Sequence, residues 1–351
     1  MFDTITEDAA LVAMIGFAGG VLLGLAARLG RFCTLGAIED FLYQGSDIRL
    51  RMWILAIGIA GLASFGLVSA GALDLTQTVY YLTPWSPLAS IIGGLLFGYG
   101  MSLSGNCGFG ALARFGGGDL RSFVIVIVMG IAAYVMLSGP LAALRVRFTD
   151  MTTFDTITQG YAGLLSSTTG LPLAPSGLLI SLLIAVAALF SKTFLNNRKA
   201  VLWSVIVGLA IASGWAGTNW VSYHGFGSVP VVSHTFSAPL GETMIFVMTS
   251  SGGGISFGVG SVFGVLTGAF IGSLIKGHFR WEACEDPREL KRQILGAVCM
   301  GFGAVIAVGC TIGQGISAFS LLAFSAPITF AAIFAGAAIG LRQLITGFAS
   351  A

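Results

Sequence analysis

The sequence predicts an all-α polytopic membrane protein with about nine transmembrane helices arranged as an inverted repeat. Of its 351 residues, 56% are hydrophobic and only 9% are charged, whereas soluble domains carry about 25% charged residues. Apolar runs of roughly 20 residues, long enough to cross a bilayer as helices, recur along the chain. A glycine frame around a cysteine also recurs, which indicates an internal duplication.

The apolar runs set the expected transmembrane spans, which are residues 9–29, 52–72, 87–106, 122–143, 176–195, 200–220, 255–275, 292–309 and 325–346. Residues 1–147 would hold the first four spans, residues 148–199 a linker with the fifth, and residues 200–351 the last four. Five crossings then separate equivalent elements, so the second half must run opposite to the first. Inverted repeats with interrupted helices are typical of secondary transporters, whose sites lie at the repeat interface.

The distribution of basic residues predicts the orientation. Of 17 lysines and arginines, Arg145 and Arg147 alone fall outside the odd-numbered connections and the end of the last span. Because cytoplasmic loops carry the basic excess, the N-terminus is expected outside and the C-terminus in the cytoplasm. The first residues lack a basic n-region, so the first helix is expected to remain. The net charge of +2 is therefore a topology signal and gives no indication of nucleic-acid binding.

Three cysteines share the glycine frame, with one glycine nine residues before the cysteine and another three residues after it. The framed cysteines and their glycines are Cys33 with Gly24 and Gly36, Cys107 with Gly98 and Gly110, and Cys310 with Gly301 and Gly313. Each glycine costs about 1 kcal/mol relative to alanine inside a helix. We therefore expect the helices to break near Cys107 and Cys310, and a helix end followed by a short second helix at Cys33.

A broken helix places particular chemistry beside each cysteine. The half-helix that follows directs unpaired N–H groups and about half a positive charge at its surroundings, which favours an anion. A thiol is a soft, polarisable contact, so the anion expected is one that contains sulfur. Irregular backbone at membrane depth is tolerated where it is buried or lines a pathway. The candidate translocation residues are Cys33, Cys107, Cys310, Gly108, Gly110, Gly313 and Gln314.

The remaining cysteines and histidines have simpler interpretations. Cys299, in the middle of a span, is expected to pack as a small hydrophobic residue, and Cys284, in a charged loop, to be incidental. His224 and His234 are expected to be loop histidines, and no metal or cofactor is predicted because no ligand cluster accompanies them. Glycines at four-residue spacing predict helix packing faces. These stripes are Gly16, Gly20 and Gly24, and Gly260, Gly264, Gly268 and Gly272.

Motifs along nearly the whole chain resemble the YeeE/YedE family of sulphur-transport membrane proteins. They are Arg31-Phe-Cys33, Gly98-Tyr-Gly100 leading to Gly105-Asn-Cys107, and Gly301-Phe-Gly303 leading to Gly309-Cys310. The resemblance implies a bacterial inner-membrane permease for thiosulfate, with Cys33, Cys107 and Cys310 matching the three pathway cysteines of the family. It also implies passage by transient S–H contacts without a covalent intermediate, and a soluble cytoplasmic sulfur-carrier protein acting nearby.

Three alternatives remain open from the sequence. Within transport, the substrate could be another small sulfur or selenium compound. A membrane sulfurtransferase would instead use a thiolate to hold sulfane sulfur as a persulfide, which requires a base or cation beside the cysteine. Arg31 stands near Cys33, but Cys107 and Cys310 have no such neighbour in the sequence, so we expect no enzyme. In the third alternative the cysteines serve packing alone.

Overall fold

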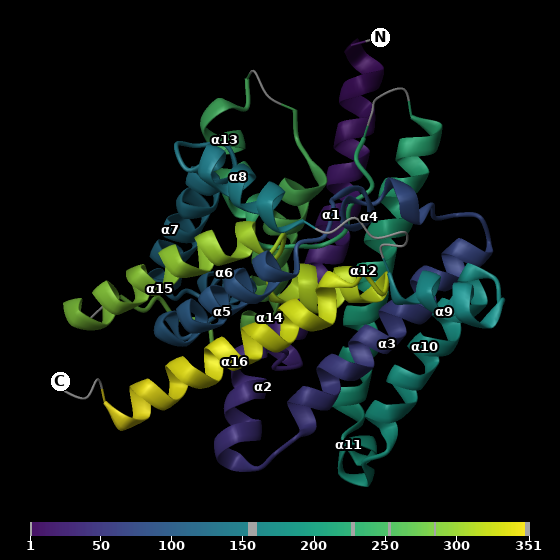
Figure 1. Ribbon diagram of the computed structural model, residues 1–351. Helices are drawn as coiled ribbons and strands as arrows, with labels where there is room; N and C mark the ends of the chain where they lie inside the picture. Colours follow the sequence, from purple (N-terminus) through teal and green to yellow (C-terminus); the bar gives the residue numbers. More distant parts are fainter. Residues whose placement is uncertain (1, 154–159, 226–228, 252–253, 284–285, 348–351) are drawn as a thin grey trace.

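The computed structural model describes residues 2–153, 160–225, 229–251, 254–283 and 286–347, and within these ranges the chain is almost entirely helical (Figure 1). β structure in this part is confined to isolated bridges such as that between Thr78 and Val231. The helices are α1 (Phe2–Leu29), α2 (Thr34–Glu39), η1 (Asp40–Gln44), α3 (Ile48–Ser69), η2 (Leu75–Gln77), α4 (Val79–Leu82), α5 (Pro87–Ser104), α6 (Gly108–Gly116), α7 (Leu120–Leu137), α8 (Ala142–Thr152), α9 (Tyr161–Thr169), α10 (Leu173–Leu189), α11 (Lys192–Asn196), α12 (Arg198–His224), α13 (Ala238–Thr249), α14 (Phe257–Ile275), α15 (Pro287–Ile306), η3 (Gly313–Ala318) and α16 (Ser325–Thr346).

Seven helical segments of the described chain are long and apolar enough to cross a membrane, or eight if the bent pair α9 and α10 forms one span. The membrane class is confirmed, but the predicted number of nine is not. The predicted span 292–309 lies on α15, which begins with the charged run Pro287-Arg-Glu-Leu-Lys-Arg292. The predicted span 176–195 lies on α10, which has only 17 residues. Both apolar stretches are shorter than the roughly 20 residues that a crossing requires.

The two glycine stripes are packing faces, as the sequence predicted, and the structure shows that they pack against each other, between α1 and α14. A Cβ at Gly20 would overlap the Ser261 carbonyl oxygen, and a Cβ at Gly264 would overlap that of Phe17. The backbones approach so closely because small residues mediate packing where lipid removes the hydrophobic drive between helices. This seam fixes the end of α1, and with it the position of Cys33.

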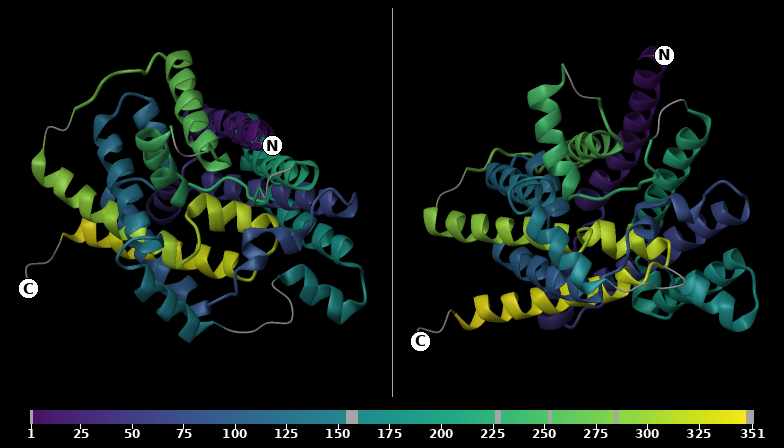
Figure 2. Two further views of the ribbon diagram at one scale, coloured as in Figure 1. Left: turned by 90° about the horizontal axis from the view of Figure 1, so that it is seen from above. Right: turned by 45° about the horizontal axis from the view of Figure 1, so that its top comes forward.

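A second group of close contacts joins α5 to α15 and α16, which lie beside one another in Figures 1 and 2. Gly98 of α5 packs within this group, against the Ile333 carbonyl of α16. Gly301 of α15 packs outside it, against the Met129 carbonyl of α7. The inverted direction of the repeat and the division into segments 1–147, 148–199 and 200–351 stay predictions.

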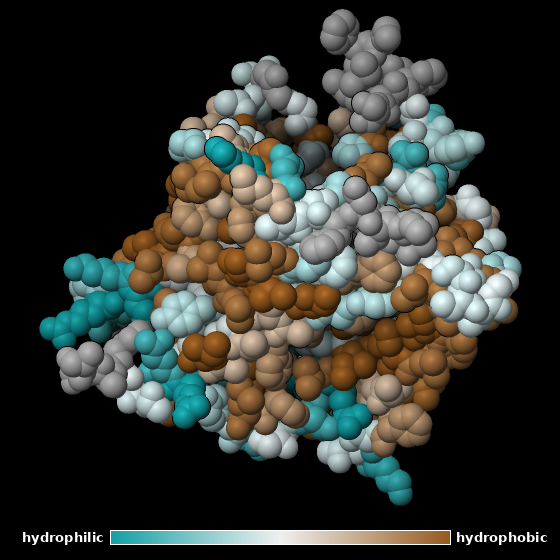
Figure 3. All heavy atoms as spheres, viewed as in Figure 1, coloured by the Kyte–Doolittle hydropathy of each residue, from teal (hydrophilic) through white to brown (hydrophobic). Residues whose placement is uncertain are grey.

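The surface fits a bilayer environment. Figure 3 shows a broad hydrophobic region across the face in view, with hydrophilic residues gathered at its lower and left margins. Exposed apolar side chains on the outer helices include Ile131, Leu183 and Leu209. The most buried large side chains, among them Trp53, Trp215 and Phe97, lie instead in the interior beside the broken helices.

Candidate functional site

The first break separates α5 from α6, where the glycine frame predicted it. α5 ends at Gly105, whose φ of 73° is the left-handed conformation that glycine adopts without strain. Cys107 then takes the N-cap position of α6, and its Sγ accepts a hydrogen bond from the Gly110 N–H at 3.3 Å. The sulfur thus satisfies one of the free N–H groups at the helix start.

The second break separates α15 from the helical segment that includes η3. Val308 (φ 57°) and Gly309 (φ 150°) turn the chain directly before Cys310. The Cys310 Sγ accepts hydrogen bonds from the Phe236 N–H at 3.2 Å and the Gly313 N–H at 3.5 Å. The Thr235 Oγ1 lies 3.7 Å from the same sulfur. Two distant chain segments therefore meet on one thiol.

The third break precedes Cys33. α1 ends at Leu29, and Arg31 has a φ of 54°, an uncommon value for a residue with a side chain. Cys33 itself is extended and stands at the N-cap of α2, where its side chain makes no capping hydrogen bond. The Cys33 thiol, which is partly exposed, is thus available to a ligand.

The structure brings the three framed cysteines together. The Cys107 thiol lies within electrostatic range of both Cys33 and Cys310, and the Thr311 side chain lies beside it. Cys107 and Cys310 have no exposed surface. The accessible Cys33 thiol and the buried Cys310 thiol thus both lie near Cys107. By contrast, Cys299 lies half-buried on α15, and Cys284 lies outside the described residues.

The glycines chosen from the sequence shape this site. A Cβ at Gly108 would meet the Met129 Sδ at 2.7 Å and the Phe236 carbonyl oxygen at 2.8 Å, so nothing larger fits there. Gly110 and Gly313 each donate an N–H to a framed cysteine. The Gly313 carbonyl accepts a hydrogen bond of 2.9 Å from the Tyr80 hydroxyl.

Gln314 is placed as a support for the second break. Its Nε2 donates to the carbonyl oxygens of Ala307 (2.9 Å) and Val308 (3.0 Å), and its Oε1 accepts from the Ser325 hydroxyl at 3.1 Å. The side chain is fully buried. Both amide hydrogens are therefore occupied by the strained backbone before Cys310, and a direct role of Gln314 in binding substrate stays a prediction.

Replacing Gln314 with alanine is expected to destabilise the protein. The two carbonyl groups would lose their donor, and each buried polar group left unpaired costs about 1 to 3 kcal/mol. The thermal midpoint of the purified protein in detergent should fall clearly. Gln343→Ala is the matched control, because Gln343 bonds only to Tyr99 in a partly buried position. Equal midpoints for the two variants would contradict this role.

A cavity of about 370 Å³ opens beside Cys33. We call it the basic cavity, because its lining includes Arg28, Arg31, Arg49, Arg114 and Lys276 together with Cys33. Gly105, Asn106 and Gly110, from the first break, also line it. The Cys107 end of α6 therefore faces the same space as Cys33.

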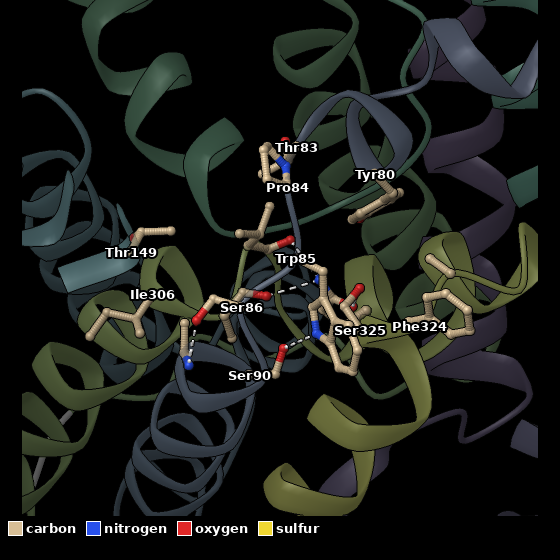
Figure 4. Close-up of a pocket in the computed structure, with 15 residues that line it drawn as sticks. Tyr80, Thr83, Pro84, Trp85, Ser86, Ser90, Thr149, Ile306, Phe324 and Ser325 are labelled. Atoms are coloured by element: carbon tan, nitrogen blue, oxygen red, sulfur yellow. Dashed lines mark hydrogen bonds between the residues drawn. The ribbon is translucent and has the colours of Figure 1, made fainter. Parts of the chain in front are cut away.

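A much smaller space lies beside the second break (Figure 4). We call it the aromatic pocket, because Tyr80, Trp85 and Phe324 line it; its volume is about 30 Å³, enough for one or two water molecules. Gln314 and Val308 of the second break contribute to its wall. Burial raises the pKa of Tyr80 above its ordinary value, so this phenol keeps its proton and continues to donate to Gly313.

The segment that contacts Cys310 was not identified from the sequence. His234 lies in a loop, as predicted. Its side chain is fully buried, and its Nδ1 lies 2.6 Å from the Ser261 Oγ. Thr235 and Phe236 follow it onto the Cys310 sulfur. Tyr80 and Thr311 were also missed. Neither periodicity nor glycine spacing marks these residues, because their role depends on contacts between distant parts of the chain.

Helices that break inside a polytopic membrane protein are typical of secondary transporters. The chain belongs to the sulphur transport family, whose model matches residues 29–339. It is 27% identical over 320 residues to the thiosulfate transporter TsuA of Escherichia coli K12, covering 86% of each chain. It is 24% identical over 318 residues to the thiosulfate transporter TsuA of Spirochaeta thermophila, covering 88% of this chain and 92% of the relative. The family resemblance noted in the sequence is thereby confirmed.

Proposed function

We propose that the protein is a bacterial inner-membrane permease that takes up thiosulfate along a pathway through Cys310, Cys107 and Cys33. The observation that supports this proposal is that each of the three cysteines follows a helix break, with two buried, hydrogen-bonded sulfurs and the partly exposed Cys33. Both relatives described above are thiosulfate transporters and align over most of the chain. Thiosulfate has a soft terminal sulfur and three oxygens, which suit thiols and N–H donors respectively.

The basic residues that line one of the two cavities support an inward direction of transport. Basic residues mark the cytoplasmic side of membrane proteins, and five of them line the basic cavity. The aromatic pocket is then the outer entrance, the N-terminus is periplasmic and the C-terminus cytoplasmic. The anion would meet Cys310 first and leave past Cys33. The positive potential of the basic cavity attracts an anion toward the proposed exit.

Passage requires the outer end to widen. The aromatic pocket holds only about 30 Å³, which is too small for a thiosulfate ion. The Tyr80 hydroxyl, which lines this pocket, donates a hydrogen bond to the Gly313 carbonyl, three residues after Cys310. On the proposed route this hydrogen bond breaks when the anion enters. A soluble sulfur-carrier protein on the side of the basic cavity would maintain the inward thiosulfate gradient by consuming the thiosulfate that has entered.

Growth on thiosulfate tests the proposal. A bacterium without its own sulfate and thiosulfate importers would carry this gene, with thiosulfate as the sole sulfur source. We expect growth with the wild-type protein and none with the empty vector. Cysteine as sulfur source is the control for viability. If growth required another sulfur or selenium compound and thiosulfate did not support it, the substrate assignment would be wrong.

A further inference from the structure

The basic cavity carries more positive charge than the described residues neutralise. Arg49 pairs with Asp40 at 3.0 Å. Among the described residues, no ion pair within 4 Å involves Arg28, Arg31, Arg114 or Lys276. The pKa of Lys276 is lowered by burial and by the neighbouring Arg31, Arg28 and Lys199. These cations therefore face one another across the cavity and repel.

The acidic residues near this cluster leave it unbalanced. Glu39 is the acidic residue in the described lining, and it interacts with Arg49 and Arg114. Asp119 lies within range of Arg28 but bonds to Arg121 at 3.3 Å. Glu282, also within range of Arg28, bonds to Arg280 at 2.8 Å. Among the described residues, one carboxylate thus faces four cations that have no carboxylate within ion-pair distance.

The cations are held in place by the fold. The Arg28 Nε donates to the Ser273 Oγ at 2.6 Å, and the Lys276 Nζ donates to the Arg28 carbonyl oxygen. A Cβ at Gly117 would overlap the Arg28 guanidinium, so the glycine leaves room for it. Arg31 keeps its place at the cavity through a left-handed backbone. Strained conformations of this kind persist where the surrounding structure holds them, and they cluster at ligand sites.

We propose that the basic cavity is a binding site for a small divalent oxyanion of the sulfate class, with Arg28, Arg31, Arg114 and Lys276 as its cations. Guanidinium groups present N–H donors in a fork that matches oxyanions, and the cavity of about 370 Å³ is within the range of small-ligand sites. Binding itself is independent of transport. If the thiosulfate pathway proposed above is correct, an oxyanion bound here occupies its exit beside Cys33.

Direct binding of radiolabelled sulfate to the purified full-length protein in detergent tests this site. Sulfate is titrated at constant ionic strength against a chloride background. The double variant Arg31→Gln/Lys276→Gln should weaken binding by roughly tenfold or more, because each charge-assisted hydrogen bond contributes about one factor of ten. Lys192→Gln, which removes an exposed basic residue outside the cavity, should leave the affinity unchanged. Wild-type protein without saturable sulfate binding would overturn the proposal, as would an unchanged affinity in the double variant.

The variant Glu39→Gln should change the sulfate affinity in the opposite direction to the double variant. A misfolded protein would not bind sulfate more tightly. Removing the carboxylate from the lining should tighten sulfate binding severalfold, whereas weaker binding would contradict the site.

A lipid headgroup offers the same phosphate-like chemistry, so the titration is repeated in nanodiscs of phosphatidylcholine and of phosphatidylglycerol. Equal sulfate affinity in both supports a soluble oxyanion. Displacement of sulfate by phosphatidylglycerol would assign the cavity to a lipid headgroup and overturn the proposal. Because no uptake is measured, a failure here is distinct from a failure of the transport assignment.

Discussion

Replacing Cys107 with alanine is expected to lower thiosulfate uptake by roughly 10- to 100-fold, because a hydrogen bond to a charged ligand contributes about 1.5 to 3 kcal/mol. Cys107 lies near both Cys33 and Cys310 and its sulfur caps α6, so we expect neither neighbouring thiol to replace it. The measurement is the initial rate of uptake into cells, at protein levels matched by immunoblot. Cys299→Ala, on α15, is the matched control and should retain full uptake.

The serine variant separates the two roles of Cys107. A serine hydroxyl can still accept the Gly110 N–H and cap α6, so Cys107→Ser should fold like the wild type. It lacks the soft, polarisable sulfur, and uptake should stay low. Full activity of Cys107→Ser would show that the cap alone matters and would remove the thiol from the mechanism.

Introducing a methyl group at Gly98 is expected to destabilise a helix-packing interface strongly. A Cβ there would overlap the Ile333 carbonyl oxygen and meet the Ala337 backbone nitrogen at 2.8 Å. Backbone cannot move aside like a side chain, so Gly98→Ala should destabilise the protein by about 1 to 3 kcal/mol or more. The readout is the midpoint of thermal unfolding in detergent, followed by tryptophan fluorescence.

Gly66→Ala provides the comparison for Gly98→Ala. Gly66 lies in α3, and a Cβ there meets nothing within 4 Å. Alanine is favoured over glycine in a helix by about 1 kcal/mol, so this variant should match or exceed the wild-type midpoint. If Gly98→Ala and Gly66→Ala behaved alike, the close approach of α5 and α16 would be refuted.

Much of the local structure follows from residue types that can be identified in the sequence. Long apolar runs with few charges specify membrane helices, and the stripes at Gly20 and Gly264 specify a packing face on each of α1 and α14. The frames around Cys107 and Cys310 located both helix breaks, because clustered glycine disfavours a continuous helix. In these cases the information lies within one segment of about 15 residues.

The contacts that assemble the site could not be predicted from local residue patterns in the sequence. Phe236 and Tyr80 reach the second break from 74 and 233 residues away, and no local pattern encodes that distance. Gln314 was selected beside Cys310, but its amide bonds to backbone carbonyls. The charged start of α15 and the bend between α9 and α10 likewise reduced the number of helices that qualify as full spans. Apolar runs alone do not show where a helix begins or turns.

Uptake of radiolabelled thiosulfate by proteoliposomes that contain only the purified protein is the most direct test of the proposed pathway. We expect accumulation above protein-free liposomes in the wild type and in Cys299→Ala. The rate should fall at least tenfold in each of Cys33→Ala, Cys107→Ala and Cys310→Ala, in line with the loss of one contact to the charged ligand. Undiminished uptake by the three single variants, or by a variant lacking all three cysteines, would contradict a pathway through these thiols.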